Sequence, residues 1–288
     1  MPHARLIHPD RPTLAFRGGQ NSELQREAVA NITNELATDR DPLVHTETRD
    51  VRSTERGTAT GNRRAANDPD TSDAYQALAN YAVELEAHVD EFQGASTANG
   101  YTYENDQSDT GQSAVLEAIE WNLTPGRRYE LDYEASIIVG RGTMEARGIT
   151  PEDVTVGASF DAMLRLDGVE LPGFRDYRVE KSIGVNPNPV FDRDSAENND
   201  IINEEGSQRR VSFEGVHTGT QSERASDDAA LENLLATQTN ITLETQFPGY
   251  SMDGYLVGYN STFEQNRAFG STEGSHRYRV EFVEGQRA

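Results

Sequence analysis

The chain has 288 residues, a formal net charge of −23 and no cysteine. This length fits one or two domains, and the lack of cysteine excludes a disulfide framework and any thiolate-held metal site. No run approaches the roughly 18 apolar residues that a membrane-spanning helix needs. We therefore expect a protein without a membrane partner.

Acidic residues occur in every segment, while Lys181 is the only lysine. This composition resembles that of proteins from extreme halophiles. At molar salt the Debye length falls to about 3 Å, so repulsion between surface carboxylates is screened. The acidity therefore predicts a salt-rich cytoplasm as the place of synthesis and indicates no specific partner.

The first half predicts strands around two helices. Residues 13–16 predict a first strand, and Ser22 to Gln25 form a capping box. Apolar residues at helical spacing then predict an N-terminal helix over 23–37. A short helix is expected over 73–82, followed by an alternating strand over 83–92. Further strands are expected over residues 101–103, 114–123 and 128–139.

The segment 141–153 is the best boundary between domains, which predicts one domain over 1–148 and a second over 149–288. In the second domain, Asp167-Gly168 predicts a hairpin turn. Residues 186–208 are polar, acidic and without periodicity, so they predict a long loop. Loops of that length inside a compact domain are usually functional or mobile.

The last third of the chain reads as a trimmed copy of an earlier segment, with 210–284 matching 51–142. The two segments share a short helix followed by an alternating strand, at 83–86 in the first and 241–244 in the second. Three further matches occur in the same order: 56–61 with 214–219, 99–103 with 253–257, and 128–133 with 277–282. The pattern predicts two copies of one domain.

The acidic loop invites a metal-site interpretation. An EF-hand fails there, because Ala196 occupies a ligand position and Glu197 stands where a glycine must turn the chain. A looser calcium or magnesium site at Asp192, Asp194 and Glu197 is the weak candidate that remains. Otherwise we predict no bound metal and no cofactor.

Signatures of catalysis are missing from the sequence. It contains no phosphate-binding loop, no nucleophile elbow and no zinc-protease motif. Gly140-Arg141-Gly142 resembles the start of a dinucleotide fingerprint, but Glu145 replaces the third glycine. Carboxylates are too numerous to single out a catalytic pair. We therefore predict a protein that is not an enzyme.

The β-rich pattern with one short helix, which ends in Arg128-Tyr129-Glu130-Leu131-Asp132-Tyr133 and again in Arg277-Tyr278-Arg279-Val280-Glu281-Phe282, resembles the tail-tube domain of tailed viruses. Two such domains in one chain resemble the versions in which three subunits form a ring with six-fold-like symmetry. Baseplate hub proteins share this plan. The resemblance implies a mainly β fold with two tandem tail-tube-like β-sandwich or barrel domains, each with a short helix, plus the N-terminal helix.

The resemblance also implies a function. It describes a virion structural protein of a haloarchaeal tailed virus that forms a ring of the tail tube or of its tube-like baseplate continuation. Its partners would be further copies of itself and neighbouring tail proteins, with DNA passing through an acidic lumen without specific binding. Insertions in such families often contact the next ring. The candidates for that contact are Asp192, Asp194, Asn199, Asp200, Glu204 and Glu205.

Two other classes of protein stay open. A receptor-binding protein or adhesin would use the long polar loop and the glycosylation sequons that begin at Asn31, Asn122, Asn240 and Asn260, although such triplets are frequent by chance in this composition. A carbohydrate-active β-sandwich enzyme would need two carboxylates on one face of a cleft, which the sequence does not locate.

Overall fold

A computed structural model describes most of the chain. The described residues are 4–8, 11–33, 43–61, 72–91, 101–105, 111–123, 130–139, 141–142, 164–171, 173–188, 200–237, 239–265 and 273–285. The fold is mainly β, as predicted, with one large and chiefly antiparallel sheet and two helices.

The elements fall into two sets along the chain, which we call the first and second units. The first unit contains β1 (Ala4–His8), β2 (Arg11–Ala15), β3 (Gly19–Thr33), β4 (Leu43–Thr60), α1 (Ser72–Glu91), β5 (Tyr101–Asn105), β6 (Gln112–Leu123), β7 (Glu130–Val139) and β8 (Arg141–Gly142). The second contains β9 (Leu164–Leu166), β10 (Val169–Leu171), β11 (Phe174–Asn188), β12 (Asp200–Thr220), α2 (Gln221–Thr237), β13 (Ile241–Thr245), β14 (Ser251–Gln265) and β15 (Glu273–Glu284).

The two units repeat one strand order. In the first it is β2-β1-β5-β6-β7-β4-β3, and in the second it is β10-β9-β13-β14-β15-β12-β11. The helix has the same place in both, after β4 and after β12. The units also join: β11 of the second pairs antiparallel with β6 of the first. Two tandem domains were expected from the sequence, but the sheet that they share was not.

The registers match in detail. Gly57 lies opposite Tyr133 and Gly215 lies opposite Tyr278, so the first predicted sequence match, 56–61 with 214–219, agrees with the pairing. Both units also interrupt the ladder at the same point, between Leu116 and Ala118 on β6 and between Leu256 and Gly258 on β14. The units therefore share irregularities as well as topology.

The other two sequence matches were wrong in register. Tyr133, rather than Tyr129, takes the position of Tyr278. Residues 99–103 were matched with 253–257, but Tyr101 pairs with Ala114 as Ile241 pairs with Gly254, so Tyr101 corresponds to Ile241. Tyrosine and glycine recur beside several turns, and a short match of this type therefore aligned different strands.

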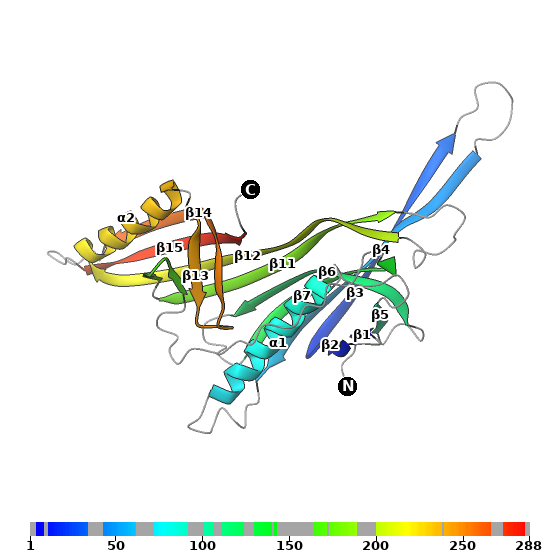
Figure 1. Ribbon diagram of the computed structural model, residues 1–288, viewed down its shortest axis with the longest axis horizontal. Coiled ribbons are helices and arrows are strands. Elements are labelled where there is room, and N and C mark those ends of the chain that lie inside the picture. The colour runs from blue at the N-terminus through cyan, green and yellow to red at the C-terminus, as the bar shows by residue number, and fades with distance from the viewer. Residues whose placement is uncertain are drawn as a thin grey trace.

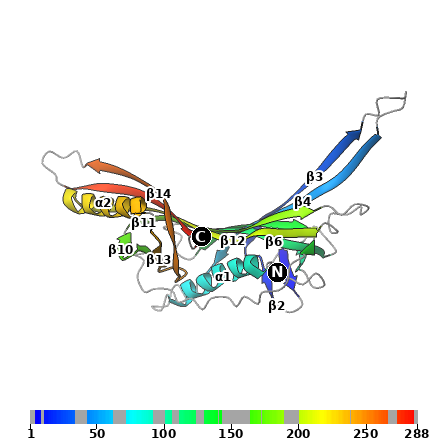
Figure 2. The ribbon, with the colours of Figure 1, turned by 45° about the horizontal axis from the view of Figure 1, so that its top comes forward.

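The sheet is a long arch (Figure 1). Figure 2 shows both helices on its convex side and the β3–β4 hairpin extending beyond the rest of the molecule. The core lies between the helices and the sheet, where Trp121, Tyr177 and Phe213 are fully buried. The opposite, concave face carries polar side chains.

Three predicted elements were wrong. The helix expected over 23–37 is replaced, as far as the structure describes it, by β3, which pairs with β4 from Gly19 to Thr33. The strand expected over 83–92 is the second part of α1. The loop expected over 186–208 is shorter, since β11 continues to Asn188 and β12 begins at Asp200. In the first and third cases, hydrogen bonding to a neighbouring strand overrides a local pattern that favours helix or loop.

One glycine in each unit occupies the same tight turn. Gly18 has a φ of 61° and Gly173 a φ of 75°. A Cβ at Gly173 would lie 1.8 Å from the carbonyl oxygen of Val216, whose N–H donates to the Gly173 oxygen at 2.8 Å. At Gly18 the corresponding distance, to the Thr58 oxygen, is 2.1 Å. Only glycine fits this approach of two backbones.

Gly173→Ala is expected to lower the free energy of unfolding by at least about 2–3 kcal/mol, because it adds a backbone clash to an unfavourable φ. The matched control is Gly168→Ala, which has a φ of 82° but no atom within 4 Å of the added Cβ. That variant should lose only about 1 kcal/mol. Urea unfolding at fixed salt measures both, and equal losses would contradict the assignment.

Candidate interaction surface

The most distinctive site of the molecule is the junction between its units, which we call the seam. It consists of β6 residues 118–123 paired with β11 residues 177–182. Tyr177 lies opposite Leu123 and Val179 lies opposite Trp121, and all four side chains are buried. The Trp121 and Tyr177 rings meet edge to face, with centroids 5.3 Å apart. An apolar core thus continues from one unit into the other.

A buried ion pair crosses the seam on its helix side. Glu86 of α1 is 1% exposed, and Arg209 of β12 is 6% exposed. Arg209 Nε donates to Glu86 Oε2 at 2.7 Å. The second carboxylate oxygen, Oε1, accepts from Trp121 Nε1 at 2.8 Å and from the Tyr250 hydroxyl at 2.9 Å. Two units that join through such a pair need both charges in place.

Electrostatics keep Arg209 charged. Burial is the largest single effect and lowers its pKa, but the charges of Glu86 and Glu284, the Tyr250 hydroxyl and the hydrogen bond to Glu86 together outweigh burial, so the pKa is raised. Burial, together with the charge of Glu86, raises the pKa of the Tyr250 hydroxyl well above its usual value, so Tyr250 remains a donor. The guanidinium also lies 4.5 Å over the Tyr250 ring. None of these residues was predicted as a site from the sequence.

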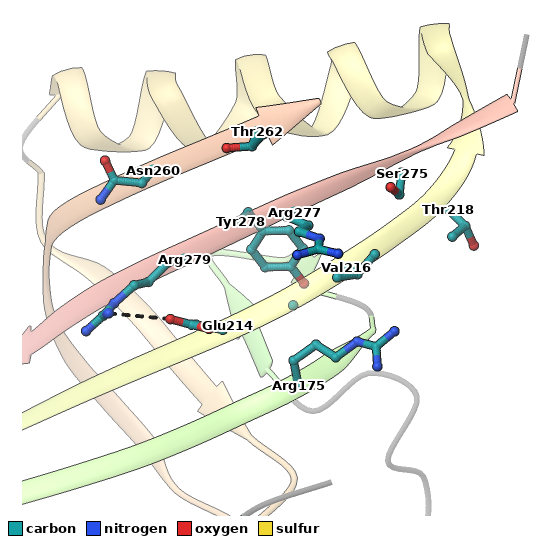
Figure 3. Close-up of a pocket in the computed structure, with 11 residues that line it drawn as sticks. Arg175, Glu214, Val216, Thr218, Asn260, Thr262, Ser275, Arg277, Tyr278 and Arg279 are labelled. Carbon is teal, nitrogen blue, oxygen red and sulfur yellow. Dashed lines mark hydrogen bonds and ion pairs between the residues drawn. The ribbon is translucent and has the colours of Figure 1, made fainter. Parts of the chain in front are cut away.

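Each unit has a cavity on the concave face, and these two cavities lie at equivalent positions. The first unit's cavity, of about 300 Å³, includes one basic and three acidic side chains, namely Arg56, Glu120, Asp132 and Glu134. The second unit's cavity, of about 690 Å³, includes one acidic and three basic side chains, namely Glu214, Arg175, Arg277 and Arg279. Figure 3 shows the second cavity, with Arg175 on β11 and both other arginines on β15. The register places Glu214 at the position of Arg56 and Arg279 at that of Glu134. Charge is therefore inverted between the units.

Arg56, Arg178 and Arg279 on this face pair with carboxylates. Arg56 Nε donates to Glu134 at 2.9 Å, which raises the pKa of Arg56, and Arg178 donates to Glu120 across the seam. In the second unit, Arg279 lies 3.4 Å from Glu214. Exposed pairs of this kind contribute little to stability, so their main effect is on which surfaces fit together.

A buried histidine lies on the opposite side of the second unit, below α2. His276 is 1% exposed, and its ring stacks on Phe263 with centroids 4.5 Å apart. The Tyr259 hydroxyl lies 3.2 Å from His276 Nε2, and Asp228 Oδ1 lies 3.5 Å from it. Burial lowers the pKa of His276, and the charge of Asp228 offsets this only in part.

His276→Leu is expected to remove part of the pH dependence of stability, since Leu131 fills the equivalent position in the first unit. The pKa of His276 is lowered in the folded chain from its usual value of 6.5. Between these two pKa values the unfolded chain therefore binds more protons than the folded chain. Wild-type stability should then fall as the pH drops below about 6.5. Urea unfolding of both proteins at several pH values measures the difference. A difference that is independent of pH would contradict this assignment.

The structure describes three of the seven residues that were predicted as sites. Asp192, Asp194, Glu197 and Asn199 lie outside the described residues. Asp200, Glu204 and Glu205 lie on β12, where Asp200 pairs with Asn188 of β11 and with Arg141 of β8. Among the described residues, no group of three or more metal-ligating side chains gathers at one point. Within those same ranges, neither helix is long and apolar enough to span a membrane.

Two comparisons found no relative that assigns a function. Neither a scan against protein-family models nor a search of curated proteins found a match.

Proposed function

We propose that this chain is a structural protein of a tailed virus from a salt-rich host, acting as one subunit of a ring in the tail tube or in its tube-like baseplate continuation. In this proposal, each unit is a tail-tube-like domain, three chains form a ring with pseudo-six-fold symmetry, and neighbouring tail proteins contact it above and below. The protein is made in the host cytoplasm and resides in the virion tail.

The observation that carries the proposal is the seam. Each unit contributes four strands to one continuous ladder, in the order β3-β4-β7-β6 and then β11-β12-β15-β14. The kind of strand pairing that joins β6 and β11 inside the chain can therefore repeat between chains. Repetition of a head-to-tail contact gives a ring when the rotation closes.

The curvature supports the same proposal. The helices lie on the convex side of the arch (Figure 2), so a ring built from arches would have the polar sheet face toward its channel. The net charge of −23 favours passage of DNA without tight binding, because phosphates are repelled by carboxylates. The sequence predicts an acidic channel, but the cavity of the second unit is basic, so in this proposal the channel wall carries basic as well as acidic regions. The ion pair between Arg279 and Glu214 offsets part of that charge.

The test is the assembly state of the full chain in about molar salt, where carboxylate repulsion is screened. Light scattering gives the mass, and negative-stain images of the same fractions give the shape. Rings or stacked tubes with an open channel are expected. A compact monomer at every concentration would count against the proposal and would turn attention to glycan binding by an adhesin.

A further inference from the structure

Comparison of the two units identifies two pairs of corresponding strands. In each pair, one strand has a partner at the seam and the other has a free edge among the described residues. Gly19 lies opposite Gly57, and Phe174 lies opposite Gly215, so β3 corresponds to β11. Likewise β14 corresponds to β6. Inside the chain, β11 and β6 form the seam. The outer edge of β3 and the edge of β14 beyond Gly254 pair with no strand that the structure describes.

The β14 edge exposes a large apolar side chain where a seam would cover it. Phe263 has the position of Leu123, yet Phe263 is 44% exposed and Leu123 is 1% exposed. Val257, just before the residues that a seam would pair, is also exposed. Exposed large apolar side chains on an unpaired edge mark an interaction surface.

The two helices differ in burial in the same way as the two edges. In α1, which packs on β6 and also on β11 of the other unit, most side chains from Ala74 to Val89 are buried. In α2, which packs on β14, only Arg224 and Leu231 are buried. The surface of α2 and β14 therefore matches the surface of α1 and β6 with its partner removed.

Charge favours β3 as that partner. At the seam, Arg178 of β11 meets an acidic region formed by Glu120 and Glu134. The corresponding residue on β3 is Glu23, which is exposed, and the region beside β14 is basic through Arg277 and Arg279. Both partners have changed sign together. This arrangement favours β3 on the edge of β14 and disfavours it on the edge of β6.

We propose that β3 of one chain pairs antiparallel with β14 of a second copy, in the register of the seam. Ser22 then lies opposite Phe263, Glu23 opposite Thr262, Leu24 opposite Ser261, Gln25 opposite Asn260, Arg26 opposite Tyr259 and Glu27 opposite Gly258. The inference rests on the proposed function in that it names the contact that closes the ring. The contact itself requires only a second copy of this chain.

Cysteine pairs test the register, because the chain has no cysteine of its own. Gln25→Cys with Asn260→Cys places thiols at directly opposed positions, where Cα atoms about 4.5–5.5 Å apart permit a disulfide. The matched control is Glu180→Cys with Glu120→Cys, the same pair at the internal seam. A second control, Gln25→Cys with Thr262→Cys, is displaced by two residues.

Each outcome decides the proposal. After mild oxidation in about molar salt, we expect the Gln25–Asn260 pair to give covalent oligomers, the internal pair to give crosslinked monomers, and the displaced pair to give at least about tenfold less product. If the protein assembles into oligomers but only the internal pair at positions 180 and 120 crosslinks efficiently, the proposed register is overturned and the ring proposal stands. Covalent chains that stay open would support the pairing and count against the ring. Monomers with an internal crosslink alone would overturn the pairing.

Charge reversal provides an independent readout. Glu23→Arg should weaken self-association about threefold to tenfold, measured by light scattering across a dilution series, because like charges then meet at the edge. Adding Arg277→Glu to the same chain should restore it. If the single and double variants associate as the wild type does, the charge assignment is overturned.

Discussion

Arg209→Met lowers the free energy of unfolding by about 3–5 kcal/mol, the loss expected when one partner of a buried ion pair is removed. Glu86 is then left 1% exposed, with only Trp121 and Tyr250 as donors. A buried carboxylate without its counter-charge is costly because the protein interior solvates it poorly. The measurement is urea unfolding at fixed salt and fixed protein concentration, since self-association would shift the apparent stability.

Two controls make that result specific. Arg178→Met removes an ion pair with Glu120 across the same seam, but both side chains are partly exposed, so it should cost at most about 1 kcal/mol. The double variant Glu86→Leu with Arg209→Met should recover only part of the loss, because it removes the unpaired buried charge but leaves the Trp121 N–H and the Tyr250 hydroxyl without their acceptor. Equal effects of Arg209→Met and Arg178→Met would contradict the buried seam.

Trp121→Ala is the second large effect, with an expected loss of about 3–5 kcal/mol. The side chain is fully buried between Tyr177 and Phe247, with ring centroids at 5.3 and 5.7 Å. Its removal leaves a cavity where the two units meet and deprives Glu86 of a hydrogen-bond donor. The far-ultraviolet spectrum should keep its β character, while unfolding shifts to lower urea.

The repeat supplies the control for this variant. Ser261 has the position of Trp121 in the second unit, and it is exposed. Ser261→Ala should change the free energy of unfolding of the monomer by no more than about 0.5 kcal/mol. A loss at Ser261 comparable to the loss at Trp121 would mean that the two edges are not as different as described.

The sequence predicted the fold class and the fact of a repeat, because both depend on patterns that recur along the chain. Gly57 and Gly215 were matched correctly. Gly57 lies where the Tyr133 side chain needs space, and Gly215 lies opposite Tyr278 as Gly57 lies opposite Tyr133. The later matches slipped in register. Short motifs rich in tyrosine and glycine recur at several turns and do not fix an alignment.

The secondary-structure errors have physical causes. In α1, Val83, Leu85, Glu86, Ala87 and Val89 are all buried, so the helix shows no clear polar face and its sequence alternates like a strand. β3 carries apolar residues at helical spacing but pairs along its whole length with β4. Hydrogen bonding to strands that are distant in sequence decides the secondary structure of such segments. Local propensity carries no information about those strands.

The candidate site was harder to predict than the fold. Trp121 is the only tryptophan and Glu86 stands within an apolar stretch, and together these were the available signals for a seam. The charge inversion between the two cavities becomes visible only when strand registers align Arg56 with Glu214 and Glu134 with Arg279. Sites made by packing one unit on another require the pairing of β6 with β11, which no local pattern shows.

The rotational symmetry of the assembled particle tests the central claim most directly. Class averages from electron micrographs in about molar salt should show closed rings with an open channel, three-fold symmetry and six lobes of two alternating kinds, because each chain supplies two similar units joined head to tail. A particle with a two-fold axis, in which identical edges meet each other, would contradict the claim that the internal seam is the pattern for assembly.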